Sequence, residues 1–333
     1  MRVAINGFGR IGRAVFRIAE TSDDIDIVAI NDLYDHDALC YLLTYDTVMG
    51  RFPGQAHIED GHMVTRRTRV RMVKESDPTR LPWGELEVDA VVESTGVFRR
   101  RDQVAMHLEA GARRALLTVP AKDAIDYMVV LGVNEDGLSR EHRIVSNASC
   151  TTNCLAPVAK VLNDSFGIRE GVMNTVHAYT NDQRLADVPH ADWRRSRAAA
   201  ENIIPTSTGA AKAVGKVLPE LAGKLDGIAS RVPVPDGSVV DLFVELERDV
   251  TVRDVHEIMQ QAAASPRLAP VLEFTTEPVV SSDIIGNPHS SIFDGSFTQV
   301  TGGRFLKSLS WYDNEWGYSN RVCDVLRIMA ALD

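Results

Sequence analysis

Residues 2–12 read RVAINGFGRIG, a short apolar run that leads into three glycines spaced G-x-G-x-x-G. The three glycines are Gly7, Gly9 and Gly12. Apolar residues then recur at helical spacing from 11 to 18, and a second apolar run follows at 25–32. The order strand, glycine-rich turn, helix, strand predicts a βαβ unit with parallel strands at the start of the chain.

In this setting the glycines predict a turn that binds phosphates. Gly7 permits a tight turn, Gly9 lets the backbone approach a pyrophosphate, and Gly12 lets the helix pack close to the strand. A helix that starts at Arg10 and Ile11 directs N–H groups and the positive end of its dipole at the phosphates. The alternative is an ordinary tight turn between strand and helix, which the combination of features makes less favoured.

Asp32 ends the second predicted strand, 20 residues after Gly12. A carboxylate at this place typically binds the ribose hydroxyls of a dinucleotide. The next residues, at 33–35, read Leu-Tyr-Asp and supply no cation for a 2′-phosphate. The sequence therefore favours NAD over NADP, the alternative being a strand-end carboxylate that faces solvent.

Strand-like and helical segments alternate up to residue 149. Strands are expected at 88–95, 115–120, 127–134 and 143–149, and a helix at 102–112. This alternation predicts an α/β fold with a mostly parallel sheet flanked by helices.

After residue 150 the pattern changes. Strands are expected at 171–179, 227–247 and 304–312, and helices after Cys150 and at 208–225, 252–264 and 321–332. We expect a Rossmann-type NAD-binding domain at 1–149, an α+β catalytic domain with a mixed or antiparallel sheet at 150–314, and a C-terminal helix at 315–333 that packs on the first domain.

Composition excludes several classes of protein. The net charge is 36 − 46 = −10, which disfavours a protein that binds nucleic acid or anionic membranes. No run of eighteen apolar residues is present, and the start of the chain lacks the pattern of a secretory leader. Four scattered cysteines in 333 residues are not a disulfide scaffold. These features are typical of a cytoplasmic protein.

The stretch SNASCTTNC at 146–154 contains Cys150 and Cys154. A disulfide does not fit, because Cβ atoms four residues apart on a helix are about 5–6 Å apart and a disulfide needs about 3.5–4.5 Å. The spacing and the missing partner cysteines and histidines also exclude a zinc site. What remains is a nucleophile, Cys150, whose thiolate the helix N-terminus would favour, with Cys154 as a packing residue; the alternative is that both are simply packed.

A nucleophile needs a base, and His177 ends a predicted strand where it could serve as one. An arginine-rich stretch follows, and Thr208 and Gly209 then open a helix suited to an anion. Arg231 lies in a later strand. For Arg195 and Arg231 anion binding and a structural role are balanced alternatives. For Arg184, Arg194 and Arg197 solvated surface residues or salt bridges are favoured.

Taken together, these segments resemble phosphorylating glyceraldehyde-3-phosphate dehydrogenase along essentially the whole chain. The matching blocks are INGFGRIGR (5–13), STG (94–96), SNASCTTNCLAP (146–157), HAYTNDQ (177–183), DWRRSRAAAENIIPTSTGAAKAV (192–214), RVPVP (231–235) and WYDNEWGYSNRV (311–322). The resemblance implies NAD-dependent oxidation of glyceraldehyde 3-phosphate with inorganic phosphate, in glycolysis or gluconeogenesis, by a cytoplasmic homotetramer that binds neither nucleic acid nor membranes and holds no metal.

The resemblance also implies roles for single residues. Cys150 is the nucleophile and His177 its base. The pocket for the substrate's phosphate is lined by Thr180, Asp182 and Arg231; that for inorganic phosphate by Ser149, Thr151, Thr208 and Gly209; Arg195 lies between them. The cofactor is bound by the glycine turn with Arg10 and Ile11, by Asp32, Thr95 and Thr118, and by Asn314 and Tyr318 at the nicotinamide. Ser76 stands on the adenine side, where many members carry arginine.

Three alternatives differ in ways that sequence or assay can distinguish. An erythrose-4-phosphate dehydrogenase of the same fold would be expected to lack Thr180 and the T-G-A-A block at 208–211, both of which are present. A non-catalytic NAD-binding relative would be expected to have lost Cys150, His177 or Asn314. An NADP-preferring member would contradict the interpretation of Asp32.

Overall fold

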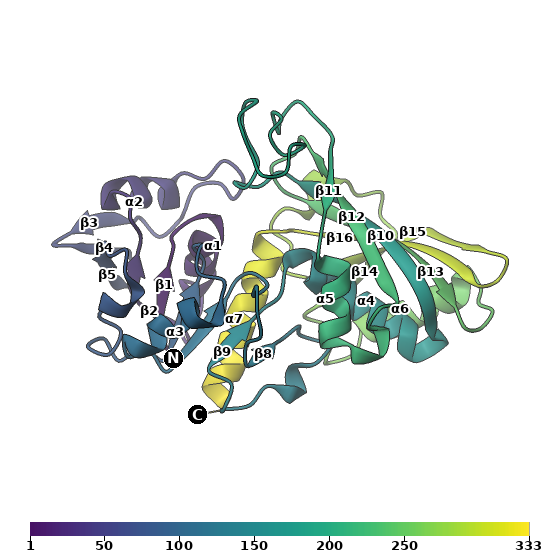
Figure 1. Ribbon diagram of the computed structural model, residues 1–333, viewed down its shortest axis with the longest axis horizontal. Coiled ribbons are helices and arrows are strands. Elements are labelled where there is room, and N and C mark those ends of the chain that lie inside the picture. Colours follow the sequence, from purple (N-terminus) through teal and green to yellow (C-terminus); the bar gives the residue numbers. More distant parts are fainter. Residues whose placement is uncertain (333) are drawn as a thin grey trace. The chain divides into compact units, whose positions relative to one another are not determined.

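The computed structural model describes residues 1–332, which form two compact units (Figure 1). The first unit comprises Met1–Val129, Asp136–Ser149 and the C-terminal segment from Ser319. The second comprises Val130–Glu135 and Cys150–Tyr318. Among residues 1–332 no helix combines the length and the hydropathy that a membrane span requires.

The first unit is built on a nine-stranded sheet in the order β3-β4-β5-β2-β1-β6-β7-β9-β8. Its strands are β1 (Arg2–Asn6), β2 (Asp26–Asn31), β3 (His57–Glu59), β4 (His62–Val64), β5 (Arg69–Val73), β6 (Ala90–Glu93), β7 (Arg114–Leu117), β8 (Tyr127–Met128) and β9 (Ile144–Ser146). Its helices are α1 (Arg10–Ala19), α2 (His36–Thr44), α3 (Arg101–Glu109) and most of α7 (Trp316–Ala331), with short 3-10 turns η1 (Pro78–Arg80) and η2 (Glu135–Gly137) nearby.

Seven of these strands, from β5 to β8, pair in parallel, and the antiparallel strands β3 and β4 extend one edge. The expected α/β fold with a mostly parallel sheet is confirmed. The strand order reverses between β1 and β6, which pair directly. Ligands of such sheets bind at the carboxyl ends of the strands beside this reversal. The turns after β1 and β6 are therefore the expected place for a ligand of the first unit.

The glycine turn after β1 has the tight geometry that its sequence predicts. Gly7 has φ +92°, and a Cβ added to it would lie 2.7 Å from the backbone nitrogen of Thr95, just past β6. A Cβ on Gly12 would lie 2.2 Å from the carbonyl oxygen of Gly7. Any larger residue at either position would force the two turns or the helix apart.

One strand expected in the first unit is shorter than predicted, and several elements of this unit were not predicted. The strand expected at 127–134 is confined to β8, because its second half leaves the sheet in a turn at Val130–Val133. The helix α2 and the strands β3–β5 were not predicted; of these, β3 and β4 have three residues each, too few for an alternating pattern to show.

The second unit is built on a seven-stranded sheet in the order β11-β12-β10-β13-β16-β15-β14. Its strands are β10 (Ile168–Ala178), β11 (Ile204–Ser207), β12 (Leu225–Val232), β13 (Ser238–Leu246), β14 (Leu272–Thr275), β15 (Ser291–Thr301) and β16 (Phe305–Tyr312). Its helices are α4 (Cys150–Phe166), α5 (Ala210–Val217) and α6 (Val252–Ala263), with 3-10 turns η3 (Pro219–Leu221) and η4 (Ser281–Ile284).

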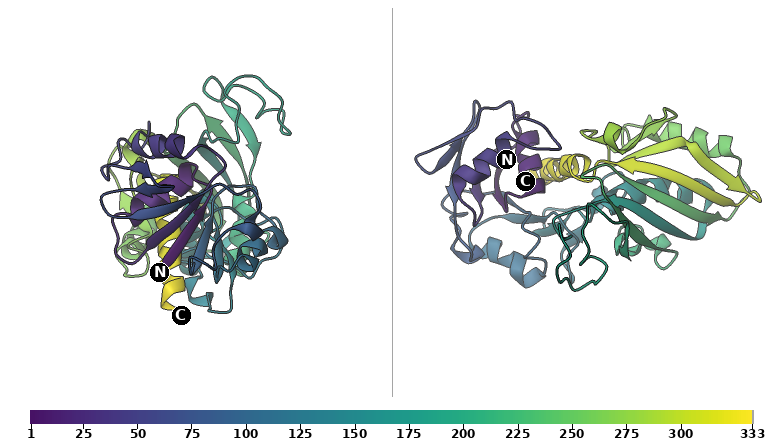
Figure 2. Two further views of the ribbon diagram at one scale, coloured as in Figure 1. Left: turned by 90° about the vertical axis from the view of Figure 1, so that its left-hand side faces the viewer. Right: turned by 90° about the horizontal axis from the view of Figure 1, so that it is seen from above.

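Pairing in this sheet is mixed, as expected: β10–β12 and β14–β15 are parallel and the other pairs antiparallel. The long strands carry the usual twist, which Figure 2 shows. Helix α4 packs on β10, β13, β15 and β16 and lies between α5 and α6 (Figure 1). Its apolar stripe is buried as predicted, with Leu155 1% exposed and Leu162 not exposed. This packing fixes the start of α4, where Cys150 lies.

Two expectations in the second unit need correction. The helix expected at 208–225 ends at Val217, because Pro219 cannot continue it and Gly215 packs against Ala222. Within the stretch 180–207, which showed no periodicity, β11 forms by antiparallel pairing with β12. That pairing depends on a distant strand and leaves no local pattern.

Candidate active site

Cys150 is the first residue of α4, at a sharp bend after β9. The bend places Ala148 in the left-handed region with φ 52°, which costs about 1 kcal/mol or more for a residue with a Cβ. The N–H of Ala148 donates to the hydroxyl of Ser146 at 3.1 Å, which supports the bend. The strand-to-helix turn thus places the thiol at the start of the helix, as the sequence predicts.

His177 lies next to the last residue of β10 and faces Cys150 within the second unit. Its Nε2 lies 3.5 Å from Cys150 Sγ, and its side chain is only 4% exposed. The parallel register of β10 and β12 puts His177 opposite Arg231. The structure therefore brings together the predicted nucleophile, the predicted base and one predicted anion-binding arginine.

The other ring nitrogen of His177, Nδ1, contacts both an acceptor and a donor. Nδ1 lies 2.7 Å from the carbonyl oxygen of Ala178, which can only accept, so one of the two neutral tautomers donates from Nδ1 to this carbonyl. In that tautomer Nε2 presents a lone pair to Cys150. The guanidinium of Arg231 donates to the same carbonyl at 3.0 Å, and its Nη1 lies 2.8 Å from Nδ1, a contact that needs the other tautomer because Nη1 can only donate. This neighbouring cation opposes a second positive charge on the ring.

Burial dominates the titration of both groups. Desolvation raises the pKa of Cys150 to about 11, against the lowering effects of Arg231 and of the N–H and hydroxyl of Thr151. Desolvation and the charge of Arg231 lower the pKa of His177 to about 3. The expectation that the helix N-terminus would lower the pKa of Cys150 is wrong in its net direction, because the cost of burying a thiolate exceeds the gain from the helix.

The pKa shifts of Cys150 and His177 are linked, because one proton can move between the two side chains. Moving it from Sγ to Nε2 creates opposite charges 3.5 Å apart. Their mutual attraction, about 4 kcal/mol at the effective dielectric of such sites, offsets part of both desolvation costs. In the resting protein the thiol of Cys150 is therefore hydrogen-bonded to a neutral imidazole. The thiolate–imidazolium pair forms when the sulfur attacks an electrophile.

Cys154 is a packing residue, as predicted. It is not exposed, and its Sγ contacts the hydroxyl of Ser291 at 3.6 Å and the carbonyl oxygen of Ser310 at 3.7 Å. Burial raises its pKa to about 12. All four cysteines are free, and no group of side chains within residues 1–332 could hold a metal ion.

Replacement of Cys154 by serine should therefore retain most activity, within about threefold of the wild type in kcat, since the residue touches neither His177 nor Arg231. A small loss of stability, about 1 kcal/mol, is expected because a hydroxyl replaces a buried thiol. Steady-state rates and thermal unfolding would measure both effects. A loss of activity comparable to that of a Cys150 variant would contradict the assignment.

The other predicted anion-binding residues differ in how they are held. Arg231 has a buried Nε with no acceptor among residues 1–332, so a donor is left for an incoming anion. Arg195 is already engaged: it pairs with Asp182 and donates to Thr206 at 3.0 Å. Asp182 therefore holds Arg195, since a carboxylate would repel a phosphate. The hydroxyl of Thr208 accepts from the N–H of Ala210 at 3.2 Å.

Thr151 has a different environment from the one expected. Its hydroxyl lies 2.8 Å from that of Tyr312, which also bonds Thr175 at 2.8 Å, and all three are buried. The ring of Tyr312 packs edge-on against His177, with centroids 5.9 Å apart. Sequence reasoning missed Tyr312, which fixes both the start of α4 and the imidazole; its position in the block WYDNE was the only local clue.

Two of the arginines that sequence analysis assigned to the surface make contacts there. Arg197 pairs with Asp187 at 2.9 Å, and Arg184 donates to the carbonyl of Pro189 at 3.3 Å. Both are surface contacts, in agreement with the favoured interpretation. Thr180 is half-buried, and Gly209 directly precedes α5.

In the first unit the residues expected to bind the cofactor gather around the glycine turn. The residue before α1 is Gly9, which has no side chain to cap the helix start and so leaves room for a phosphate there. The carboxylate of Asp32 accepts the N–H of Phe8 at 2.7 Å, so it stands beside the turn. These features fit a dinucleotide: backbone too close for any Cβ, a helix start preceded by glycine and a carboxylate at the end of β2.

The other residues of the first unit that are expected to bind the cofactor differ in burial and in their hydrogen bonds. Thr118 is buried and donates to the carbonyl of Glu93 at 3.1 Å, and Thr95 bonds the carboxylate of the same residue. Ser76 is exposed. Sequence reasoning missed Glu93 and its buried partner His107, whose Nε2 lies 3.0 Å away. This pair holds the turn after β6 beside the glycine turn.

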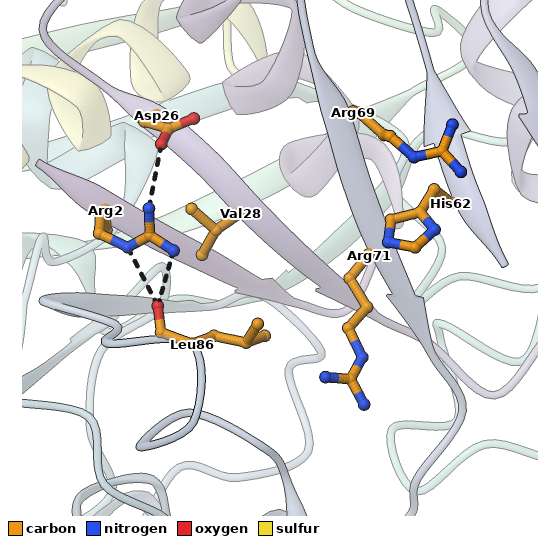
Figure 3. Close-up of a pocket in the computed structure, with 7 residues that line it drawn as sticks. All are labelled: Arg2, Asp26, Val28, His62, Arg69, Arg71 and Leu86. Carbon is orange, nitrogen blue, oxygen red and sulfur yellow. Dashed lines mark hydrogen bonds and ion pairs between the residues drawn. The ribbon is translucent and has the colours of Figure 1, made fainter. Parts of the chain in front are cut away.

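A further pocket of about 370 Å³ lies on the first unit, away from the glycine turn (Figure 3). It is lined by Arg2, Asp26, Val28, His62, Arg69, Arg71 and Leu86. Its arginines are matched by carboxylates: Arg71 pairs with Glu85 at 2.7 Å and Arg69 with Glu59 at 2.6 Å. The pocket contains none of the residues that sequence analysis singled out.

Comparisons with known proteins agree with this geometry. Residues 1–101 match the NAD binding domain of glyceraldehyde 3-phosphate dehydrogenase, and residues 149–314 match its C-terminal domain. The chain is 54% identical to the glyceraldehyde-3-phosphate dehydrogenase of Streptomyces coelicolor, over 98% of this chain and 97% of the relative. It is 55% identical to that of Borreliella burgdorferi over 98% of both, and 52% identical to that of Geobacillus stearothermophilus over 99% and 98%. The chain belongs to the glyceraldehyde-3-phosphate dehydrogenase family.

Proposed function

We propose that this chain oxidises D-glyceraldehyde 3-phosphate with NAD and inorganic phosphate to 1,3-bisphosphoglycerate, through an acyl intermediate on Cys150. The observation that carries the proposal is the 3.5 Å approach of Cys150 Sγ to His177 Nε2, with Arg231 beside the ring. It unites a nucleophile, a base and a cation for a phosphorylated aldehyde. The family relationship supports the identity of the substrate.

The protein's own residues perform the proton chemistry. Sγ adds to the aldehyde carbon as Nε2 takes the thiol proton, which gives a hemithioacetal. The imidazolium formed in this step can donate to the developing oxyanion. As hydride leaves the carbon of the hemithioacetal, Nε2 takes back the hydroxyl proton; NAD, when bound, supplies the ring that accepts the hydride. Phosphate then displaces the thiol from the resulting thioester, and Nε2 returns the proton to sulfur.

Anion binding at Arg231 helps the base. In the free protein burial and the charge of Arg231 lower the pKa of His177, and the Nε of Arg231 is a buried donor without an acceptor among residues 1–332. A phosphate dianion against this guanidinium neutralises its charge. The pKa of His177 then rises toward its ordinary value, so the base becomes effective when the substrate is in place.

The proposal also assigns the contacts with each ligand to particular residues. Residues 1–149 bind NAD through the glycine turn, Asp32, Thr95 and Thr118, and 150–314 bind the substrate. Thr180 and Arg231 contact the substrate's phosphate; Ser149, Thr151, Thr208 and Gly209 contact inorganic phosphate. Asn314 and Tyr318 contact the nicotinamide. Ser76 faces the adenine side.

We also propose a cytoplasmic homotetramer. The loop at 184–203 exposes Leu185 by 87% and Trp193 by 84%, and large apolar side chains so exposed are typical of subunit contacts. Sedimentation of the purified protein would test the assembly.

The direct test of the function is phosphate dependence. With NAD and glyceraldehyde 3-phosphate, added phosphate should raise steady-state NADH formation by about 100-fold or more, because attack on the thioester by water is slow without the bound anion. NADP should support a much lower kcat/KM, as the carboxylate of Asp32 repels a 2′-phosphate. Faster turnover of erythrose 4-phosphate, or a clear preference for NADP, would contradict the proposal.

A further inference from the structure

Two buried carboxyl groups face each other in the second unit. Asp236 lies in the turn between β12 and β13, and Asp313 directly follows β16; each is only 1% exposed. The two carboxyls are within hydrogen-bonding reach of each other. Two ionised carboxylates in contact away from water repel strongly, so a proton must lie between them.

Their surroundings decide which one holds the proton. Asp313 accepts three backbone N–H groups, from Gly286 at 2.7 Å, Glu315 at 2.8 Å and Trp316 at 2.6 Å. Asp236 accepts the N–H of Gly237, at 2.8 Å, and no other backbone N–H of residues 1–332. Its other oxygen, Oδ2, is buried and receives no N–H or O–H from any residue in 1–332. N–H donors favour an ionised carboxylate, so Asp313 is the anion and Asp236 the acid.

We propose that Asp236 stays protonated at neutral pH and donates a hydrogen bond to Asp313, and that this acid–carboxylate pair is the positioning device that fixes Asn314 for the cofactor. The inference rests on the proposed function, in which Asn314 contacts the nicotinamide. Asp236 touches neither substrate nor cofactor and acts through its neighbours.

Asn314 is linked to both aspartates through neighbouring residues and one side-chain hydrogen bond. Asn314 follows Asp313 directly, and its Oδ1 accepts the hydroxyl of Ser238 at 2.6 Å. Ser238 is two residues from Asp236 and pairs with Tyr312 in the sheet. Its hydroxyl also accepts the N–H of Ala178, next to His177, at 3.0 Å. With Oδ1 occupied, the amide N–H₂ of Asn314 is directed to a ligand acceptor.

Electrostatics agrees with the geometry. Burial raises the pKa of Asp236 to about 9, and the charges of Asp313 and Glu315 add to this effect. Burial also raises the pKa of Asp313, which its backbone donors oppose. The third titratable neighbour is Cys150, whose pKa Asp236 raises when ionised. No cation is among the leading causes of the raised pKa of Asp236 within the described chain.

The sign of the pH effect follows. Between about pH 4, the usual pKa of an aspartate, and pH 9 the folded protein holds a proton that the unfolded chain has lost. Stability from this group therefore falls as pH rises through that window. Above pH 9 the pair becomes two anions that push the segments at 236–238 and 312–314 apart.

The test compares the wild type with Asp236→Asn, whose amide donates to Asp313 at every pH. The matched control is Asp249→Asn at an exposed aspartate paired with Arg304. Calorimetric NAD titrations should show the wild-type Kd rising about tenfold from pH 8 to pH 10, as the protonated fraction falls about tenfold. The Kd of Asp236→Asn should stay flat, and the control should follow the wild type. An equal alkaline rise in Asp236→Asn would overturn the proposal.

A second measurement does not depend on the cofactor. At pH 8 the infrared spectrum of the wild type should contain the C=O band of a buried carboxylic acid, and Asp236→Asn should lack it. The assignment of the proton to Asp236 would be refuted if both proteins showed the band, or if the wild type lacked it. A wild type that binds no NAD at pH 8 yet shows the band would refute the proposed function instead.

Discussion

Replacement of Cys150 by serine should lower kcat for glyceraldehyde 3-phosphate oxidation by about 10⁴-fold or more, because a hydroxyl is a far weaker nucleophile than a thiol that can ionise. The fold should be unchanged, since the side chain differs by one atom and is half-buried. NADH formation, NAD affinity and thermal unfolding measured on one preparation would separate chemistry from folding.

Cys154→Ser is the matched control, because it makes the same substitution four residues along the same helix. The two variants should differ in kcat by about three to four orders of magnitude. Comparable activity of Cys150→Ser and the wild type would show that the thiol at the start of α4 is not the nucleophile.

Replacement of His177 by asparagine should lower kcat by about 10²–10⁴-fold, the usual contribution of a positioned base. The amide can keep the contact with the carbonyl of Ala178 but cannot take a proton from Cys150. The KM for the aldehyde should change much less than kcat, because Arg231 still presents its guanidinium to the substrate's phosphate.

The same variant also tests how the two groups are coupled. Removing the imidazole removes the attraction that favours thiolate, so the pKa of Cys150 should rise further and the thiolate fraction at pH 7–8 should fall. Alkylation by iodoacetamide follows that fraction, so it should be slower in His177→Asn at pH 8 and approach the wild-type rate as pH rises. Equal alkylation rates at pH 8 would indicate that the two side chains are not coupled.

The sequence predicts the parts of this protein that local spacing determines. The glycine turn, α1 and the bend into α4 each follow from residues close together in the chain. Cys154 could be assigned to packing because helical geometry alone excludes its disulfide with Cys150. The ion pair of Asp182 with Arg195, thirteen residues away, could not.

The rest depends on contacts between distant segments. The approach of Arg231 to His177 comes from the parallel register of β10 and β12, which no local pattern shows. Tyr312 reaches Thr151 from 161 residues away. The net pKa shift of Cys150 was predicted with the wrong sign because the helix start is visible in sequence and the depth of burial is not. Burial of Asp236 against Asp313 is hidden for the same reason.

The central claim is that oxidation forms a thioester on Cys150 which phosphate then cleaves. Rapid mixing of the protein with NAD and glyceraldehyde 3-phosphate in phosphate-free buffer measures it most directly. A burst of about one NADH per Cys150, followed by a near stop that added phosphate releases, is the predicted result. Continuous NADH formation without a burst, at a rate that phosphate does not change, would contradict the account.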